Sequence, residues 1–495
     1  MIGRGPRLRR ATVVLILALV SLPVADHAQE WPREGPPAPL AARPVVVPPY
    51  QIRTLANGLQ VVVVLQHEQP SVAFRLIVRA GAVQEPAGRP GVASLVATLL
   101  NQGTSTRSAE AIATEIDSAG GVIGVGSGSE LTFVNGAVIK DRTDLALGLA
   151  ADIVEHPAFA PEEIELQRRQ VLSSLQVAYD DPEYIANAVL DRLVFGEHPY
   201  GRPDLGTPTS IARITRDDLV AFHRQWFVPN NALLAIVGDL TADEAFAAAE
   251  RAFGGWRRGD VPAIPPTTPP PPARRIVVID RPGSAQTEIR VGILGLSRGH
   301  PDYLALELAT RILGGEGANR LFGVLRTQNA LTYGAGADLH AFKSSGEIVA
   351  ETNTRTATTV EALKLVIGEF ARLPRDPINP DELRGAEDFI TGHYPLLIES
   401  SGAIAEEVIA HLFFGQALSE IDTYLERVTR TTPAMVQRVA REVIKPGQLS
   451  VVLVGSASAF EPQLRAAGFL DYELIKLADL DLDSPTLRRA TSGVR

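Results

Sequence analysis

Hydrophobic and polar positions follow two alternating periods along the chain, and the same order of elements occurs twice. Apolar runs at residues 59–65 and 72–78 predict strands. Apolar residues at helical spacing then predict a helix over 92–100 with one buried face. The order returns later in the chain, where the pattern predicts strands at 275–279 and 288–294 and a helix at 303–313.

The two stretches also end with the same pattern. In each, an apolar segment is followed by a proline and a strand, and the strand ends in glycine nine residues after the proline: Pro229 and Gly238, then Pro446 and Gly455. Several matches in the same order indicate an internal duplication. Because neighbouring strands are close enough in sequence to form hairpins, we expect α+β halves, each a mostly antiparallel sheet covered by helices.

Proline-rich segments set the boundaries of these halves. Four consecutive prolines at 269–272 lie in a linker, 262–273, that cannot form a helix or a central strand. We therefore expect an N-terminal domain at 50–261 and a C-terminal domain at 274–472, joined as a clam-shell. A proline-rich tail is expected at 29–49 and a polar tail at 473–495.

The first 28 residues have the pattern of a secretory signal peptide. Four arginines precede an apolar run at 11–25, which is too short for a comfortable membrane span. Cleavage after Ala25 or Ala28 would export the chain. We expect a periplasmic location with no membrane span after cleavage, and an uncleaved anchor is the lesser alternative.

The net charge and the cysteine content exclude several kinds of partner and of catalytic site. The chain has 47 Lys and Arg against 57 Asp and Glu, a net charge of −10. This argues against a nucleic-acid partner, because nucleic-acid binders present a basic face. Cysteine is absent, which excludes disulfides, thiol nucleophiles and cysteine-ligated metal sites, and leaves nine histidines for any metal chemistry.

The predicted helix at 92–100 lies in a frame that resembles a known family. Gly91, Ala93, Gly103 and Thr104 match the G-x-A-H-x-x-E-H-x-x-x-x-G-T segment of the pitrilysin/insulinase zinc peptidases, the inverzincins. The resemblance extends over roughly residues 50–470 and includes the segments at 180–182, 198–207 and 226–239. It implies two homologous α+β halves around an enclosed chamber.

This chain departs from the family at the positions that bind and use zinc. Ser94 and Thr98 replace the two histidines, Ala97 replaces the catalytic glutamate, and Ser174 stands where the distal glutamate ligand is expected. Hydroxyl and methyl groups can neither hold zinc nor take a proton from its water. The resemblance therefore implies no metal in this chain. A relocated site near Asp152 and His156 is a weak alternative, because His156 precedes a proline at an expected helix end.

A second segment of the family is retained. Residues 314–333 resemble the G-G-x-x-S-R-L-F…L-R-x-x-x-x-L-x-Y segment, and the pattern predicts a helix face followed by a strand in which Tyr333, Ala335, Ala337 and Leu339 alternate. In the family, the matching arginine and tyrosine bind substrate backbone and stabilise the oxyanion, roles that fall here on Arg326 and Tyr333. In the alternative, Arg326 pairs with a carboxylate and Tyr333 packs in the sheet.

The resemblance implies a divided site. Some bacterial and mitochondrial members, such as mitochondrial processing peptidase, are heterodimers in which one subunit carries H-x-x-E-H. We expect this chain to be the zinc-less subunit of an exported heterodimeric zinc endopeptidase, with zinc in the partner and with peptides or unfolded segments as substrates. The alternatives are a catalytically inactive structural or peptide-binding subunit and, ranked last, an independent hydrolase, because Ser94 and Ser174 lack a G-x-S-x-G elbow.

Overall fold

The structure is a computed structural model that describes residues 48–263, 267–315, 317 and 319–489. The chain divides into the units Met1–Arg43 and Pro44–Arg495, and all described residues belong to the second. The predicted signal peptide at 1–28 and nearly all of the predicted tail at 29–49 lie outside the described residues. Within the described ranges, no helix is long and apolar enough to cross a membrane.

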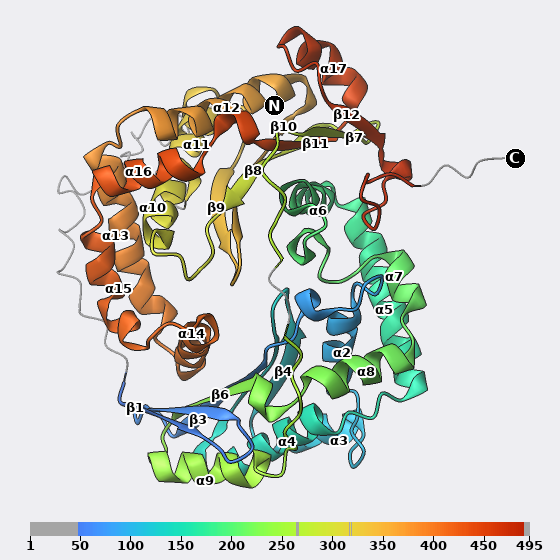
Figure 1. Cartoon of the computed structure of the whole chain (residues 1–495), viewed down its shortest axis with the longest axis vertical. Helices are drawn as coiled ribbons and strands as arrows, with labels where there is room; N and C mark the ends of the chain where they lie inside the picture. Colours follow the sequence, from blue (N-terminus) through green and yellow to red (C-terminus); the bar gives the residue numbers. More distant parts are fainter. Residues whose placement is uncertain (1–47, 264–266, 316, 318, 490–495) are drawn as a thin grey trace, which may run out of the picture. The chain divides into compact units, whose positions relative to one another are not determined.

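The first half of the described chain is built on a six-stranded sheet (Figure 1). In spatial order its strands are β1 (Tyr50–Thr54), β2 (Gln60–Leu65), β6 (Ala232–Gly238), β3 (Ser71–Val78), β5 (Thr132–Ile139) and β4 (Val122–Ser127). Only the β2–β6 pair is parallel, and the other four pairs of this sheet are antiparallel. The predicted strands at 59–65 and 72–78 are therefore neighbours of β6, whose glycine end closes the repeat.

The second half repeats this sheet. Its order is β12 (Glu473–Lys476), β7 (Ile276–Asp280), β11 (Ser450–Gly455), β8 (Gln286–Gly295), β10 (Gly346–Arg355) and β9 (Ala335–Ala341). Five strands correspond one to one between the halves, with the last strand of each repeat inserted between the first two. The predicted fold class, α+β in two homologous halves, is confirmed, with mixed sheets that are mostly antiparallel.

Helices connect the strands and cover both faces of each sheet. In the first half they are α2 (Val92–Leu100), α3 (Ala109–Ser118), α4 (Thr143–Glu155), α5 (Pro161–Asp180), α6 (Pro182–Phe195), α7 (Pro208–Arg213), α8 (Arg216–Trp226) and α9 (Ala242–Phe253). In the second half they are α10 (Tyr303–Gly314), α11 (Arg320–Phe322), α12 (Thr359–Arg375), α13 (Pro380–Leu397), α14 (Ser401–Phe414), α15 (Ser419–Thr429), α16 (Pro433–Val443) and α17 (Ala457–Ala466).

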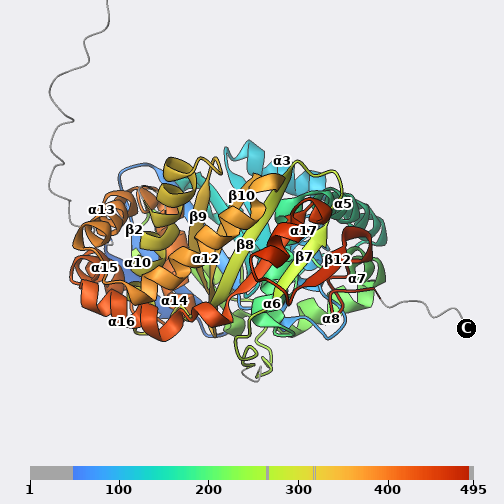
Figure 2. The ribbon, with the colours of Figure 1, turned by 90° about the horizontal axis from the view of Figure 1, so that it is seen from above.

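One face of each sheet packs against helices of its own half. Leu76 of β3 lies in a buried cluster with Leu95 of α2 and Leu147 of α4. In the second half, Val291 of β8 shares a cluster with Val366 of α12, and Figure 2 shows α12 crossing the strands on that side. Because successive side chains of a strand point to opposite faces of the sheet, every second residue of these strands faces the helices and is buried by them.

The other face of each sheet is covered by a helix from the opposite half. Helix α6 packs on β8 and β11, and α14 packs on β3 and β6. Val189 of α6 is buried with Val452 of β11, while Ile409 of α14 is buried with Leu233 of β6. The two halves are therefore joined by an exchange of helices in addition to the covalent linker.

The segment expected to be a polar tail from residue 473 is partly structured. Residues Glu473–Lys476 form β12, which pairs in parallel with β7 at the edge of the second sheet. Leu480, Leu482 and Leu487 are buried beside α6. The prediction was wrong here because these apolar residues are isolated among charged ones, and such spacing gives no strand or helix signal.

Candidate functional site

Helix α2 forms where the sequence predicted it, and a buried carboxylate caps it. Its N-cap residue Gly91 has φ of 94°, a left-handed conformation that favours glycine. The Oε1 atom of Glu85 accepts hydrogen bonds from the backbone N–H groups of Gly91 and Ala93, both at 2.9 Å. Burial raises the pKa of Glu85 to about 8, although these hydrogen bonds act in the opposite direction. The framework of the helix is thus intact.

The residues in place of the zinc ligands do not form a metal site. Ser94 and Ala97 are buried, and Thr98 donates its hydroxyl to the backbone carbonyl of Ser94 at 2.9 Å. Ser174 lies on an exposed position of α5, a helix that packs against α2. In the part of the chain that the structure describes, no three His, Asp or Glu side chains gather as a metal site requires. The donor set does not fit zinc.

The side chains of the alternative metal site, Asp152 and His156, are engaged in other contacts. His156 Nδ1 lies 3.7 Å from Asp152 Oδ1. The second oxygen of Asp152 accepts hydrogen bonds from Thr104 Oγ1 and Arg107 Nη1, both at 2.8 Å. This carboxylate therefore ties the end of α4 to the loop after α2, which is a structural role.

The retained arginine and tyrosine are brought together by a main-chain contact. Arg326 lies on a π-helical turn, Gly323–Gln328, and its Nη1 donates to the backbone carbonyl of Tyr333 at 2.7 Å. Its guanidinium also lies 5.0 Å from the ring centroid of Phe322. The alternative in which Arg326 pairs with a carboxylate is therefore not the contact observed, and Arg326 instead holds the loop that carries Tyr333.

Tyr333 does not lie in a strand. Strand β9 begins at Ala335, two residues later than the alternation suggested, and the Tyr333 side chain is 83% exposed. It lines a cleft of about 580 Å³ together with Phe322, Arg290 and Glu351. The sequence predicted wrongly that Tyr333 begins the strand, because the backbone bends at Tyr333 and the carbonyl of Gly334 accepts hydrogen bonds from the hydroxyls of Thr332 and Thr352. The phenol is accessible from this cleft.

A buried arginine closes the floor of the cleft. Arg290 of β8 is 2% exposed, and its Nη1 lies 3.1 Å from Glu288 Oε2. Its Nε donates to Asn187 Oδ1 of α6 at 2.6 Å, so it links the exchanged helix to the second sheet. Arg290 was not predicted from the sequence, although a charged residue inside an apolar strand pattern is a usable signal of a buried ion pair.

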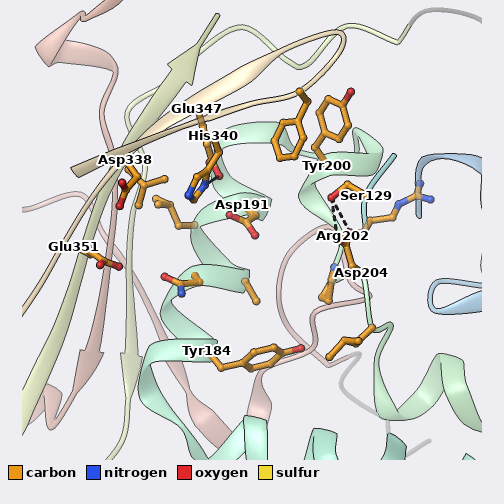
Figure 3. A pocket seen from close by; sticks show the side chains of 17 residues that line it. Ser129, Tyr184, Asp191, Tyr200, Arg202, Asp204, Asp338, His340, Glu347 and Glu351 are labelled. Atoms are coloured by element: carbon orange, nitrogen blue, oxygen red, sulfur yellow. Dashed lines mark hydrogen bonds and ion pairs between the residues drawn. The ribbon is translucent and has the colours of Figure 1, made fainter. Parts of the chain in front are cut away.

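A second cavity of about 450 Å³ adjoins this cleft and shares Asp338 and Glu351 with it (Figure 3). The first half contributes Asp191 of α6, and the second half contributes Glu347 of β10. Sequence reasoning missed this cavity because its carboxylates come from four separate segments, and only the packing of α6 on the second sheet brings them together.

Comparisons with known proteins agree with this architecture. Residues 60–208 match the sequence model of insulinase (peptidase family M16), and residues 213–388 match that of the peptidase M16 inactive domain. A protein described as an uncharacterized zinc protease from Mycobacterium tuberculosis is 29% identical over 441 residues, which cover 88% of this chain and 99% of the relative.

Solved structures show the same fold. The crystal structure of a peptidase M16 inactive domain from Pseudomonas fluorescens is 28% identical with a TM-score of 0.78, over 82% of this chain and 98% of that chain. A chain of complex III2 from Candida albicans, 16% identical, covers 83% of this chain and 97% of its own length with a TM-score of 0.70, which shows the fold alone. With matches in both halves, the chain belongs to the insulinase (M16) peptidase family.

Proposed function

We propose that this chain is the zinc-less subunit of an exported heterodimeric zinc endopeptidase. The observation that carries the proposal is the contrast between the two halves. The first half keeps helix α2 but has Ser94, Ala97 and Thr98 at the zinc positions. The second half keeps Arg326 in contact with Tyr333, whose phenol is exposed in the cleft. Such a chain has substrate-binding groups without a metal to activate water.

The partner would be a homologue with an intact H-x-x-E-H motif that supplies zinc and the general base. In the joint site, the Tyr333 hydroxyl donates a hydrogen bond to the carbonyl oxygen of the scissile peptide bond as it gains negative charge. Arg326 holds the Tyr333 loop through the main-chain carbonyl, and its remaining N–H groups can bind substrate backbone. The substrate is a peptide or an unfolded segment, and export depends on the signal-like residues 1–28.

Reconstitution tests the proposal. The chain, a zinc-bearing homologue from the same genome and their mixture are purified, and zinc content, complex size and turnover of a quenched peptide are measured. We expect no stoichiometric zinc in the chain alone, a specific complex of at least standard interface size, and turnover that requires both chains. One zinc per isolated chain would contradict the proposal.

A homologue that is equally active alone and in the complex would also contradict it. That outcome would instead support the alternative of a catalytically inactive structural or peptide-binding subunit. A mixture of the homologue with an unrelated periplasmic protein controls for non-specific stabilisation of the enzyme.

A further inference from the structure

A pocket of about 190 Å³ lies among helices α10, α13, α14 and α15 of the second half, which are grouped on the left of Figure 1. We term it the four-helix pocket. Among the described residues, its lining shares none with the cleft that holds Tyr333. Ligand pockets commonly enclose about 300–1,000 Å³, so the four-helix pocket fits a small molecule rather than a peptide chain.

Two arginines of the lining lie over aromatic rings. The Cζ atom of Arg298 lies 4.3 Å from the ring centroid of Tyr303, and that of Arg311 lies 5.0 Å from the ring centroid of Phe389. The N–H donors of a guanidinium lie in its plane, so contact with a ring face leaves them free to bind an acceptor. The Nε atom of Arg311 is buried and has no hydrogen-bond acceptor among the described residues. The pocket therefore lacks an acceptor at this point.

The carboxylate of Glu307 lies near these arginines at distances that leave a gap. Its Oε1 is 3.9 Å from Nε of Arg311, and both its oxygens are 3.5 Å from the hydroxyl of Tyr424. Charge-assisted hydrogen bonds are normally about 2.7–2.9 Å long. Burial raises the pKa of Glu307, although Arg298 and Arg311 act in the opposite direction. A ligand between these groups would replace long contacts with direct hydrogen bonds.

The formal charges of the lining balance, with three arginines against three glutamates, so the free hydrogen-bonding groups decide what binds. Glu420 and Arg427 pair with each other at 2.7 Å. Glu407 accepts a hydrogen bond from the hydroxyl of Tyr394 at 2.9 Å. The unused capacity is therefore on the donor side, in the guanidinium groups, and it favours a ligand that is rich in acceptors.

An apolar side faces the same space. Leu304 and Ile390 line the pocket and are buried, and the rings of Phe389 and Tyr394 lie in the same lining. Hydrocarbon groups gain free energy when such a surface removes them from water. The pocket thus suits a molecule with one anionic end and a short hydrocarbon part.

We propose that the four-helix pocket binds a small organic carboxylate. The carboxylate accepts hydrogen bonds from Arg298 and Arg311, and the hydrocarbon part packs on Leu304 and Ile390. A carboxylate matches the planar fork of a guanidinium, whereas an inorganic anion would leave the apolar side uncovered. The site is separate from Arg326 and Tyr333, so the inference goes beyond the proposed function and does not depend on it.

Ligand-observed NMR titration of the whole chain tests the pocket without a partner or turnover. The probes are hexanoate, hexanamide, hexylamine and inorganic phosphate. We expect hexanoate to bind about tenfold or more tightly than hexanamide, because charge-assisted hydrogen bonds are stronger than neutral ones. Hexylamine and phosphate should bind more weakly still. Equal binding of hexanoate and hexanamide, or tighter binding of hexylamine or phosphate than of hexanoate, would overturn the proposal.

Matched substitutions locate the effect. Arg311→Gln removes the guanidinium and should weaken hexanoate binding about tenfold or more. Glu307→Gln keeps the shape of the side chain and removes a negative charge beside the ligand, so it should strengthen hexanoate binding. Arg169→Gln, an exposed change on α5, is the control and should leave binding unchanged. Unchanged binding by a folded Arg311→Gln protein would overturn the assignment, and so would weaker binding by Glu307→Gln, which remains informative if Arg311→Gln does not fold.

A peptide distinguishes the source of the carboxylate, because the same group ends every polypeptide chain. The probes are a pentapeptide with a free C-terminal carboxylate and its C-terminal amide. We expect both to bind more weakly than hexanoate, since the volume of the pocket excludes a peptide chain. Tighter binding of the free-acid pentapeptide than of hexanoate would overturn the assignment to a small molecule.

Discussion

At the scale of single residues, the carboxylate of Glu85 caps the N-terminus of helix α2. Glu85 holds the N-terminus of the helix by accepting hydrogen bonds from the backbone N–H groups of Gly91 and Ala93. A carboxylate at a helix N-terminus is favoured by the helix dipole, whereas burial disfavours its charge. With its pKa raised to about 8, burial dominates, and Glu85 is largely protonated at neutral pH.

This gives a pH-dependent prediction for Glu85→Gln. Between pH 4.5 and 8, the unfolded chain releases the Glu85 proton while the folded chain keeps it, so the wild-type free energy of unfolding falls as pH rises. The amide oxygen of the introduced glutamine can still accept from both N–H groups. We expect the variant to match wild type at pH 4.5 and to exceed it by roughly 4 kcal/mol at pH 8 in urea denaturation.

The exposed substitution Glu110→Gln is the control and should show no such pH-dependent difference. A Glu85→Gln protein that is less stable than wild type at pH 8 would show instead that Glu85 is charged and stabilises the helix dipole.

Residue positions on α2 could be predicted from the sequence, but contacts of the Arg326–Tyr333 segment could not. Helical spacing alone places Ser94 and Thr98 on one face, since residues four apart lie one turn apart. The exposure of Tyr333 depends on where β9 begins, and the pairing of β9 with β10 extends only to Ala335. The cavity between α6 and the second sheet depends on packing between the halves, which no local pattern encodes.

At the scale of elements, the exchange of α6 and α14 joins the halves. Each helix follows a long helix of its own half and packs on the sheet of the other. The strands and helices of the repeat were predictable because their apolar periods are strong. The exchange was not predictable, because an apolar helix face specifies that it needs an apolar partner but not which of two similar sheets provides it.

Truncating the buried side chain at Ile409 of α14 tests this contact. Ile409 is 2% exposed in the cluster between α14 and the first sheet. We expect Ile409→Ala to lower the free energy of unfolding by about 2–4 kcal/mol, the usual cost of a large-to-small change in a core. Urea denaturation followed by circular dichroism measures the loss.

Leu396→Ala on α13 is the matched control, because Leu396 is 64% exposed and its truncation should change stability little. Equal effects of the two substitutions would mean that α14 contributes little to the association of the halves.

At the scale of the whole molecule, the C-terminal segment closes the second sheet and contacts the first half. Thr207 of the first half donates its hydroxyl to Asp483 at 2.6 Å, and Leu480, Leu482 and Leu487 are buried beside α6. The outer edge position that β1 fills in the first sheet is filled by β12 in the second. The segment therefore links the two halves after the repeat has ended.

Removing residues 473–495 should destabilise the whole molecule. The truncation takes away β12 and exposes the apolar surface that three buried leucines cover. From the usual value of a buried leucine, we expect the thermal unfolding midpoint to fall by roughly 10 °C or more in calorimetry. A chain that ends at Arg489 keeps every described residue and is the control. An unchanged midpoint after removal of 473–495 would show that the segment only rests on the surface.

Duplication gives each half of the chain its own framework. Each half has its own sheet and buried core, so the zinc positions of the first half can change without disturbing the segment that carries Arg326 and Tyr333. The division of the chain into two halves could be predicted from the repeated pattern.

The most direct test is the turnover of a quenched peptide by the reconstituted heterodimer carrying Tyr333→Phe. The substitution removes one exposed hydroxyl, so folding and assembly should be unchanged, and Tyr50→Phe in β1 is the control. We predict that turnover falls about 100- to 1000-fold, the usual cost of losing one oxyanion donor. Wild-type turnover by a fully assembled Tyr333→Phe complex would contradict the proposed role of Tyr333, and Arg326 and Tyr333 would no longer be site residues.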